Sequence, residues 1–324
     1  MTPAASAQGL VAHRADDSGL DVVTGAFSYS GSSVARALLQ SGRQVRTLTG
    51  HAGRAPTGTA IDVHPLDFDD QLGLVASLSG ATTLYNTYWV RFARRSVDHE
   101  RAVANSRTLF QAAERAGVQR IVHVSITHPS SDSPLPYFRG KALVECALAE
   151  CEFSYAIVRP AILFGGDGVL LNNIAWLLRR LPVFAIGGRG DYRIRGIHVD
   201  DLAQLCLAKA AETHDSVTDA VGPERPTFTE LVRSIRDVVG SRARLLHVPG
   251  ATVPVFARVL GLGLHDVLLT ADEYRAMAAG LADTDGPATG PTALSAWLTE
   301  HGAGLGLRYA NELKRHFDDT GVPT

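Results

Sequence analysis

The sequence predicts an α/β fold: a doubly wound parallel sheet followed by a smaller, mostly helical C-terminal part. First, short apolar and β-branched runs alternate with helical segments between residues 20 and 160, as in repeated strand–helix–strand units. Second, a glycine-bounded turn, GAFSYSG, links the first of these strands to a helix. Third, the alternation stops after Phe164, where three glycines within four residues mark a loop.

The alternating part can be assigned element by element. Strands are expected at residues 20–24, 44–48, 60–66, 82–87, 120–125 and 153–159, and helices at 32–40, 69–78, 98–116 and 137–150. Gly117 is a typical residue to end the third of these helices. Because strands alternate with helices, the sheet should be parallel and covered on both faces, with ligands bound at the carboxyl ends of its strands.

The rest of the chain is expected to be less regular. We expect a helix at 172–181, a return strand at 191–199, and a helix at 200–211 that Asp200 or Asp201 caps. A strand and turn should follow near 219–223, then a helix at 229–239 and a short strand at 244–248. Residues 253–317 should be mostly helical, interrupted by a DTDGPATGPT loop.

Composition excludes several classes of protein. The chain has 324 residues, of which 45% are hydrophobic, enough for a buried core. A net charge of −2 gives no basic excess for binding nucleic acid. No apolar run is long enough to span a bilayer, and the first 18 residues contain no signal-peptide core. We therefore expect a cytoplasmic protein that binds no membrane and no nucleic acid.

Three residues carry the candidate chemistry. Tyr137 and Lys141 are four residues apart, so on a helix they share a face, and Ser125 ends the strand before it. Together they supply a proton donor, a cation to lower its pKa, and a hydroxyl to orient a carbonyl. With eight tyrosines and three lysines, chance gives roughly 0.07 such pairs per chain. A half-buried tyrosine beside a solvated lysine is the alternative on spacing alone.

The turn between Gly25 and Gly31 is the candidate phosphate site. A strand, a glycine turn and a helix in this order direct backbone N–H groups and a helix N-terminus toward a bound phosphate. The alternative is an ordinary strand-to-helix turn. Its place in the first unit of the series favours the phosphate site.

In this order, five segments resemble the short-chain dehydrogenase/reductase superfamily in its extended and atypical branches, the NAD(P)-dependent epimerase/dehydratase and NmrA-like proteins. They are VTGAFSYSG at the first turn, Asp67-Phe68, Ser125 followed by Tyr137-x-x-x-Lys141, VRPAILFG at 158–165 and IHVDDLA at 197–203. The resemblance covers roughly residues 20–225. It implies a Rossmann-like domain at 19–165, to which 191–222 returns, and a substrate-binding domain formed by 166–190 and 223–324. Residues 1–18 would be a flexible tail.

The resemblance also implies an activity: an NAD(P)(H)-dependent oxidoreductase that acts on a carbonyl or alcohol of a small molecule by hydride transfer. Tyr137 would be the general acid/base, Lys141 would bind the nicotinamide ribose and lower the pKa of Tyr137, and Ser125 would bind the substrate oxygen. Alternatives are an epimerase or dehydratase that uses the cofactor transiently, and a non-catalytic NADP-binding redox sensor or assembly protein. A homodimer is the expected oligomeric state.

Two departures from the family pattern concern the cofactor. Ser28 replaces the middle glycine of the loop. No acid follows the second strand, where Thr49, His51 and Arg54 would accept a 2′-phosphate, so NADP is expected, with NAD possible. Alternatively, His51 and Arg54 belong to a solvated loop.

The implied cofactor-binding residues are Gly25, Phe27, Ser28, Tyr29, Ser30, Gly31, Thr49, His51, Arg54, Asp67, Phe68, Asn86, Thr87, Tyr88, Ser125, Tyr137, Lys141, Pro160 and Ile162. The candidate substrate residues are Trp89, Arg91, Thr127, His128, Phe164, Trp176 and Arg193. No metal ligands are expected.

Overall fold

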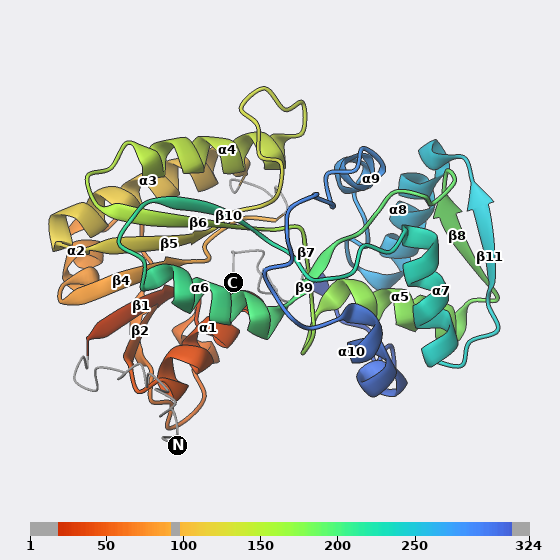
Figure 1. The fold of residues 1–324 in the computed structure, drawn as a ribbon, viewed down its shortest axis with the longest axis horizontal. Helices are drawn as coiled ribbons and strands as arrows, with labels where there is room; N and C mark the ends of the chain where they lie inside the picture. Colours follow the sequence, from red (N-terminus) through yellow and green to blue (C-terminus); the bar gives the residue numbers. More distant parts are fainter. Residues whose placement is uncertain (1–18, 92–97, 313–324) are drawn as a thin grey trace, which may run out of the picture.

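The computed structural model describes residues 19–91 and 98–312. Seven parallel strands form the central sheet in the order β10-β6-β5-β4-β1-β2-β3 (Figure 1). They are β1 (Leu20–Thr24), β2 (Gln44–Thr49), β3 (Asp62–Pro65), β4 (Ala81–Asn86), β5 (Arg120–Val124), β6 (Ser154–Pro160) and β10 (Ser216–Ala220). The predicted doubly wound parallel sheet is confirmed. The strand order reverses between β1 and β4, and ligands of such sheets bind at this switch point.

Helices cover both faces of this sheet. On one face lie α1 (Tyr29–Gln40) and α6 (Val199–Ala210), and on the other lie α2 (Gln71–Leu78), α3 (His99–Ala116) and α4 (Pro136–Ala149) (Figure 1). Successive residues of a strand point to opposite faces. Accordingly, Val22 packs in the core beneath α2, α3 and α4, whereas Val23 packs in the core beneath α1 and α6.

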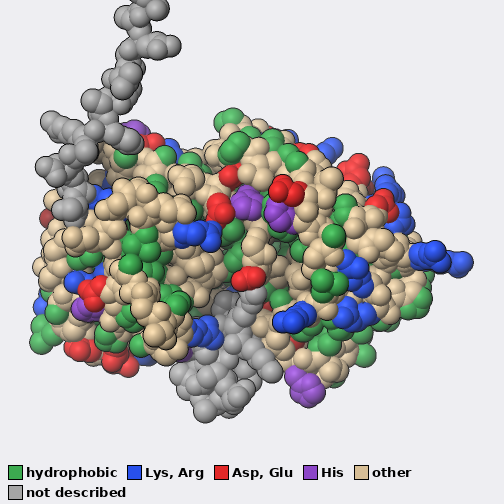
Figure 2. Space-filling view, turned by 90° about the horizontal axis from the view of Figure 1, so that it is seen from below, with side chains coloured by type: hydrophobic (Ala, Val, Ile, Leu, Met, Phe, Trp, Pro, Cys, Tyr) green, Lys and Arg blue, Asp and Glu red, His purple; other side chains and the backbone are tan. Residues whose placement is uncertain are grey.

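The C-terminal part forms a second lobe with its own apolar core. Its helices are α5 (Val169–Arg180), α7 (Phe228–Val238), α8 (Val253–Leu264), α9 (Ala271–Ala278) and α10 (Leu294–His301). Two-stranded sheets pair β8 (Val183–Gly187) with β11 (Arg244–Val248), and β7 (Ile162–Phe164) with β9 (Gly196–His198). Short 3-10 turns occur as η1 (Ala52–Arg54), η2 (Gly250–Thr252) and η3 (Gly302–Gly304). In Figure 2, a view from below, Lys and Arg side chains gather over this lobe, on the right.

Two predictions for this part are wrong. Of the return strand expected at 191–199, only β9 forms, and it pairs with β7; the strand that returns to the central sheet is β10. Arg195 is buried and donates to the carbonyls of Gly222, Thr284 and Gly286, so the alternating pattern around it reflects carbonyl binding rather than a long strand.

The second error concerns the start of α6. Its N-cap is His198, whose Nδ1 accepts from the backbone N–H of Asp200. The Asp201 carboxylate instead accepts from the backbone N–H and hydroxyl of Thr292. Across residues 19–91 and 98–312, no helix combines the length and the apolar character needed to cross a bilayer.

Candidate active site and cofactor site

The glycine turn packs too tightly for a side chain at its end. Gly25 has a positive φ of 67°, and a Cβ on Gly31 would lie 2.1 Å from the carbonyl oxygen of Gly25. Ser28 is the N-cap of α1, and its Oγ accepts from the N–H of Gly31 at 3.3 Å. Because Ser28 has a φ of −87°, it needs no glycine to adopt its conformation. The turn therefore keeps the close packing of a phosphate loop, with a capped helix N-terminus behind it.

Loops from several strands meet beside this turn. Oγ1 of Thr24 accepts from the N–H groups of Thr87 and Tyr88, and Oγ1 of Thr87 donates to the carbonyl of Thr24. The Phe68 ring packs on Tyr88 with centroids 4.9 Å apart. The hydroxyl of Tyr29 donates to the carbonyl of Gly165 at 2.7 Å. The structure thus brings together the candidates that follow β1, β3 and β4.

The segment directly after β2 contains polar and basic residues and no acid, as the sequence shows. Thr49 is buried, and its Oγ1 accepts from the N–H of His51 at 3.1 Å. Arg54 is exposed in η1. The first acid after β2 is Asp62 in β3, where it pairs with Arg46. No carboxylate therefore follows β2 directly, in the position that would repel a 2′-phosphate.

Ser125 and Lys141 meet at the end of β5. Nζ of Lys141 donates to the carbonyl of Val124 at 2.9 Å, and the next residue is Ser125. The Ser125 Oγ is buried without a hydrogen-bond partner among the described residues. A buried hydroxyl without a partner is costly. It is therefore a place where a bound ligand can supply the missing contact.

Tyr137, one helical turn before Lys141, lies in a cluster of aromatic rings. Its ring meets the edges of Trp89 and His99 at centroid distances of 5.6 and 5.7 Å. Trp89 and His99 stack on each other, and the ammonium of Lys141 lies 4.6 Å from the Trp89 ring centroid. A Cβ on Gly140 would lie 2.8 Å from this indole, so the glycine permits the contact.

The sequence does not reveal His99, which is the first residue of α3 and follows its cap, Asp98. The Trp89 Nε1 and the His99 Nδ1 are also buried without partners in the described part of the chain. Of the four unpartnered buried side-chain atoms among the described residues, three therefore belong to Ser125 and to the two rings beside Tyr137. His99 could not be found from the sequence, because no sequence motif identifies a histidine at the start of a helix as a site residue.

The pKa values correct one expectation. Burial raises the pKa of Tyr137 to about 12, although the nearby Arg91 charge opposes this. Burial lowers the pKa of Lys141 to about 7, partly offset by Glu145. Burial and the Lys141 charge hold the pKa of His123 well below its usual range. Lys141 thus does not lower the pKa of Tyr137 in this structure, because it is bonded to the backbone and desolvated.

Lys141→Met should remove a pH dependence of stability. The folded-state pKa near 7 lies below the 10.5 of an ordinary lysine. In that window the unfolded chain binds the proton and the folded chain does not, so stability rises with pH. Lys141→Met should flatten this slope and stabilise the protein below pH 7, by an amount on the order of a few kcal/mol. Urea unfolding across the window measures it.

Lys209→Met is the matched control, because Lys209 pairs with Glu212 near the surface. It should give no comparable stabilisation. Equal slopes for wild type and Lys141→Met would contradict the assignment of a desolvated lysine.

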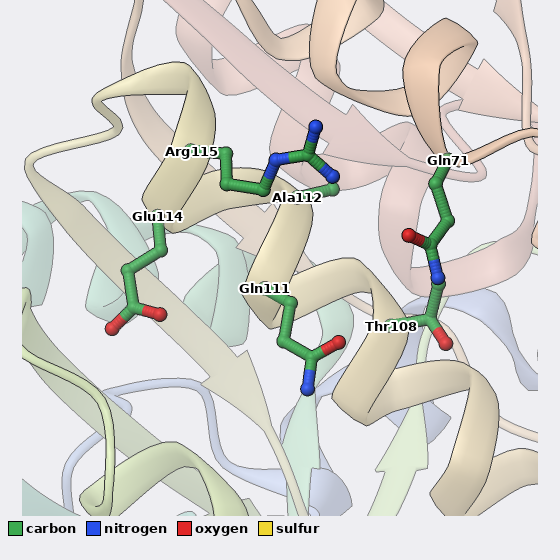
Figure 3. A pocket seen from close by; sticks show the side chains of 6 residues that line it. All are labelled: Gln71, Thr108, Gln111, Ala112, Glu114 and Arg115. Carbon is green, nitrogen blue, oxygen red and sulfur yellow. The ribbon is translucent and has the colours of Figure 1, made fainter.

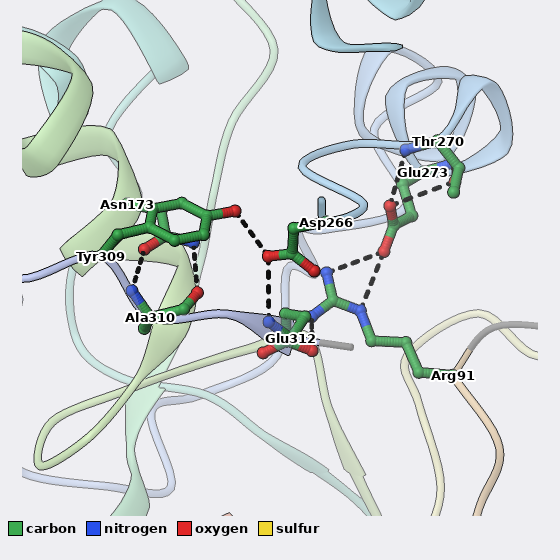
Figure 4. Close-up of polar contacts among 8 residues, drawn as sticks. All are labelled: Arg91, Asn173, Asp266, Thr270, Glu273, Tyr309, Ala310 and Glu312. Carbon is green, nitrogen blue, oxygen red and sulfur yellow. Dashed lines mark hydrogen bonds and ion pairs between the residues drawn. The ribbon is translucent and has the colours of Figure 1, made fainter. Parts of the chain in front are cut away.

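Arg91, a candidate substrate residue, is part of an ion-pair network. Its guanidinium donates to Glu273 of α9 at 2.9 and 3.0 Å and to Glu312 at 2.6 Å (Figure 4). These carboxylates raise its pKa against the opposing effect of burial. Asp266 accepts from the N–H of Glu312 and from the Tyr309 hydroxyl. The network attaches the C-terminal segment to the loop after β4.

The other substrate candidates lie mostly outside the site. Thr127 is buried, and its hydroxyl donates to the carbonyl of Leu281, which joins the two lobes. Phe164 is in the core of the C-terminal lobe, where it packs on Trp297. Trp176 packs on Tyr309, and the exposed Arg193 donates to the carbonyl of Arg225. His128 is exposed with a left-handed φ of 55°.

The remaining cofactor candidates are divided between the turn and the strand ends. Phe27 lies in the glycine turn and Ser30 in the first turn of α1. Asp67 is exposed and accepts from the N–H of Asp69. The Pro160 carbonyl accepts from the N–H of Thr127, and Ile162 pairs with Gly196 in β7.

A cavity of about 240 Å³ lies between α2 and α3 (Figure 3). It is lined by Gln71, Thr108, Gln111, Ala112, Glu114 and Arg115. None of the candidate residues lines it, so it has no part in the site. No group of metal-ligating side chains occurs in the described ranges.

Comparison with known proteins identifies the nucleotide-binding part. Residues 25–173 match the NAD(P)H-binding family. A ceramide reductase from Caulobacter vibrioides is 26% identical over 276 residues, which cover 79% of this chain and 86% of that protein. Subunit 9 of the NADH dehydrogenase 1 alpha subcomplex from Arabidopsis thaliana mitochondria is 25% identical over 240 residues. That match covers 70% of this chain but only 60% of the plant subunit.

Solved structures share the fold over nearly the whole chain. An NADPH-dependent quinone oxidoreductase from Escherichia coli, complexed with NADPH, has a TM-score of 0.72 and 23% identity, covering 87% of this chain and 99% of that one. A Citrobacter triphenylmethane reductase complexed with NADP(H) has a TM-score of 0.72 and 18% identity, covering 86% and 99%. The match to the NAD(P)H-binding family confirms the predicted NAD(P) cofactor class.

Proposed function

We propose that this chain, whose residues 25–173 match the NAD(P)H-binding family, is an NAD(P)(H)-dependent oxidoreductase acting on a carbonyl or alcohol. The observation that carries this is the buried, unpartnered hydroxyl of Ser125 at the end of β5. It follows directly on the carbonyl that holds Lys141, and Tyr137 lies one helical turn earlier. A phenol, an ammonium and a free hydroxyl at a strand end suit proton transfer to a substrate oxygen.

The residues fit the cofactor at two points. A Cβ on Gly31 would collide with the Gly25 carbonyl, so the turn closes against the start of α1 only with glycine there, and Ser125 has an unmet hydrogen bond. When bound, the nicotinamide supplies or accepts the hydride. Ser125 would donate to the substrate oxygen, and Lys141 would bind the nicotinamide ribose.

Reduction is the direction we propose. A raised pKa keeps the Tyr137 phenol protonated at neutral pH. A protonated phenol can donate to a carbonyl oxygen, whereas oxidation of an alcohol would need the phenolate as a base. The rings of Trp89, His99 and Phe138 around Tyr137 favour an apolar or aromatic substrate. The second lobe, from 166–190 and from residue 223 onward, would complete the substrate pocket.

NADPH should bind more tightly than NADH. The end of β2 offers Thr49, His51 and Arg54 and no carboxylate. A 2′-phosphate would gain a charge-assisted contact from Arg54 and meet no repulsion. Calorimetric titration should give a Kd for NADPH about tenfold or more below that for NADH. Arg54→Ala should remove most of the difference, and the exposed Arg107 of α3 offers a control in Arg107→Ala. Tighter binding of NADH would contradict this preference.

A non-catalytic NADP-binding role is the second candidate. Two observations favour this role. The raised pKa of Tyr137 disfavours ionisation of the phenol, and the Trp89 indole lies against the ammonium of Lys141. Relatives named as NADH dehydrogenase subunits fit an assembly role. Stopped-flow mixing of the NADPH complex with ketones, aldehydes and quinones separates the two, because only an oxidoreductase consumes NADPH. Transient cofactor oxidation without net consumption would support an epimerase or dehydratase.

A further inference from the structure

Helix α8 exposes an apolar face. Among the described residues, large hydrophobic side chains with high exposure are few, and five of them lie on this one helix: Val255, Phe256, Val259, Leu260 and Leu262. Their exposed fractions run from 37% to 72%. At about 100° per residue they occupy one continuous arc, and Gly261 is the buried position on the opposite side. Exposed apolar clusters of this size mark interaction surfaces.

The segment that carries this face is basic. Residues 240–265 contain Arg242, Arg244, Arg258, His247 and His265 but no Asp or Glu. With 33 acids in 324 residues, a segment of this length would ordinarily hold two or three. Arg242, Arg244 and Arg258 are exposed. Arg258 lies on α8 at the edge of the apolar arc, and Arg244 pairs in register with Val183 of β8.

This surface lies at one end of the molecule. In Figure 1, α8, β8 and β11 form the right-hand end, away from α2 and the edge of the central sheet. The exposed Leu246 of β11 and Val183 of β8 add apolar surface at the same end. Nothing in the described part of the chain covers the arc.

We propose that α8 attaches the protein to the surface of a membrane that contains anionic lipids. An amphipathic helix with an apolar face and basic flanks lies in the headgroup region, where lipid tails cover the apolar side chains and anionic headgroups neutralise the arginines. With 12 residues, α8 is too short to span a bilayer, so the length criterion used for spanning helices does not apply to it.

Charge distinguishes this occupant from a second copy of the chain. A two-fold contact through α8 would pair the same surface with itself. Arg258 lies near the middle of the helix, so it would face its own copy across the contact, with no carboxylate in residues 240–265 to compensate. An anionic headgroup layer supplies the missing negative charge without requiring a matching shape.

Flotation of the full-length protein with vesicles tests the proposal and needs no enzymatic activity, so its outcome is independent of the proposed function. We expect binding to vesicles of phosphatidylcholine mixed with phosphatidylglycerol, weaker binding to phosphatidylcholine alone, and a loss of binding at high salt. Val259→Asp should weaken binding by about tenfold or more, and Arg258→Glu by about fivefold or more. Both positions are exposed, so folding should survive, which circular dichroism can verify.

Leu72→Asp is the matched control, because Leu72 is equally exposed but lies on α2 at the other end of the molecule. It should bind vesicles like the wild type. The proposal is overturned if the wild type does not float with anionic vesicles at low salt, or if Val259→Asp and Leu72→Asp bind alike. A wild-type dimer in light scattering that Val259→Asp dissociates, without vesicle binding, would instead assign the face to a second copy.

Discussion

Tyr137→Phe is expected to lower kcat by about 10²–10⁴-fold, the usual contribution of a positioned proton donor. The change deletes one hydroxyl and keeps the ring that packs against Trp89 and His99. Folding and NADPH affinity should therefore survive, which calorimetry can verify before kinetics are measured. Lys141→Ala should cost as much or more, because it also loses the proposed ribose contact. Since the two residues act as a unit, the double variant should be little worse than either single one.

Tyr155→Phe is the control for this series. Tyr155 is a partly buried tyrosine of β6 that packs on the core of the sheet, so losing its hydroxyl should leave kcat unchanged. Turnover by Tyr137→Phe close to that of the wild type would remove Tyr137 from the mechanism. In that case Ser125 alone would remain as a hydrogen-bond donor to the substrate.

Gly31→Val is expected to raise the Kd for NADPH by roughly ten- to a hundredfold. The added Cβ would lie 2.1 Å from the Gly25 carbonyl oxygen, which is backbone and cannot rotate away. The start of α1 must then shift, at a cost of about 1–3 kcal/mol, and a tenfold change in Kd corresponds to about 1.4 kcal/mol. Fluorescence titration of NADPH measures the loss.

Two further variants show whether a loss of NADPH binding comes from the packing of the turn or from the Ser28 hydroxyl. Gly304→Val adds the same side chain in η3, outside the cofactor site, where no atom lies within 4 Å of the new Cβ, so it should leave the Kd unchanged. Ser28→Gly should cost only a few tenths of a kcal/mol, because glycine is an adequate N-cap. Loss of binding in Ser28→Gly would mean that the serine hydroxyl itself binds the phosphate. An unchanged Kd in Gly31→Val would refute the close-packed turn as the cofactor site.

The sequence predicts the sheet well because its signals are local. The alternation of apolar runs with helical segments, the turn at Gly25 and the stop at Gly117 each depend on neighbouring residues. The relative position of Tyr137 and Lys141 follows from helical spacing in the same way, and α4 contains both. Such features are encoded within a few residues.

The contacts of the candidate substrate residues do not follow from the sequence, because their partners are distant along the chain. Arg91 pairs with Glu273 and Glu312, far along the chain. Thr127 bonds to Leu281, and Trp176 packs on Tyr309. A single arginine or tryptophan looks the same whether it binds a substrate or joins two lobes. The pKa of Lys141 is likewise set by burial, which spacing does not reveal.

The central claim is that Ser125, Tyr137 and Lys141 reduce a carbonyl with hydride from the bound cofactor. The most direct measurement is a single turnover of the NADPH-loaded protein with apolar ketones and quinones, for wild type and Tyr137→Phe at matched NADPH occupancy. We predict that the wild type consumes NADPH with at least one carbonyl compound, and that Tyr137→Phe does so about 10²–10⁴-fold more slowly. Bound NADPH that no carbonyl compound oxidises, or oxidation at equal rates in both proteins, would contradict the claim.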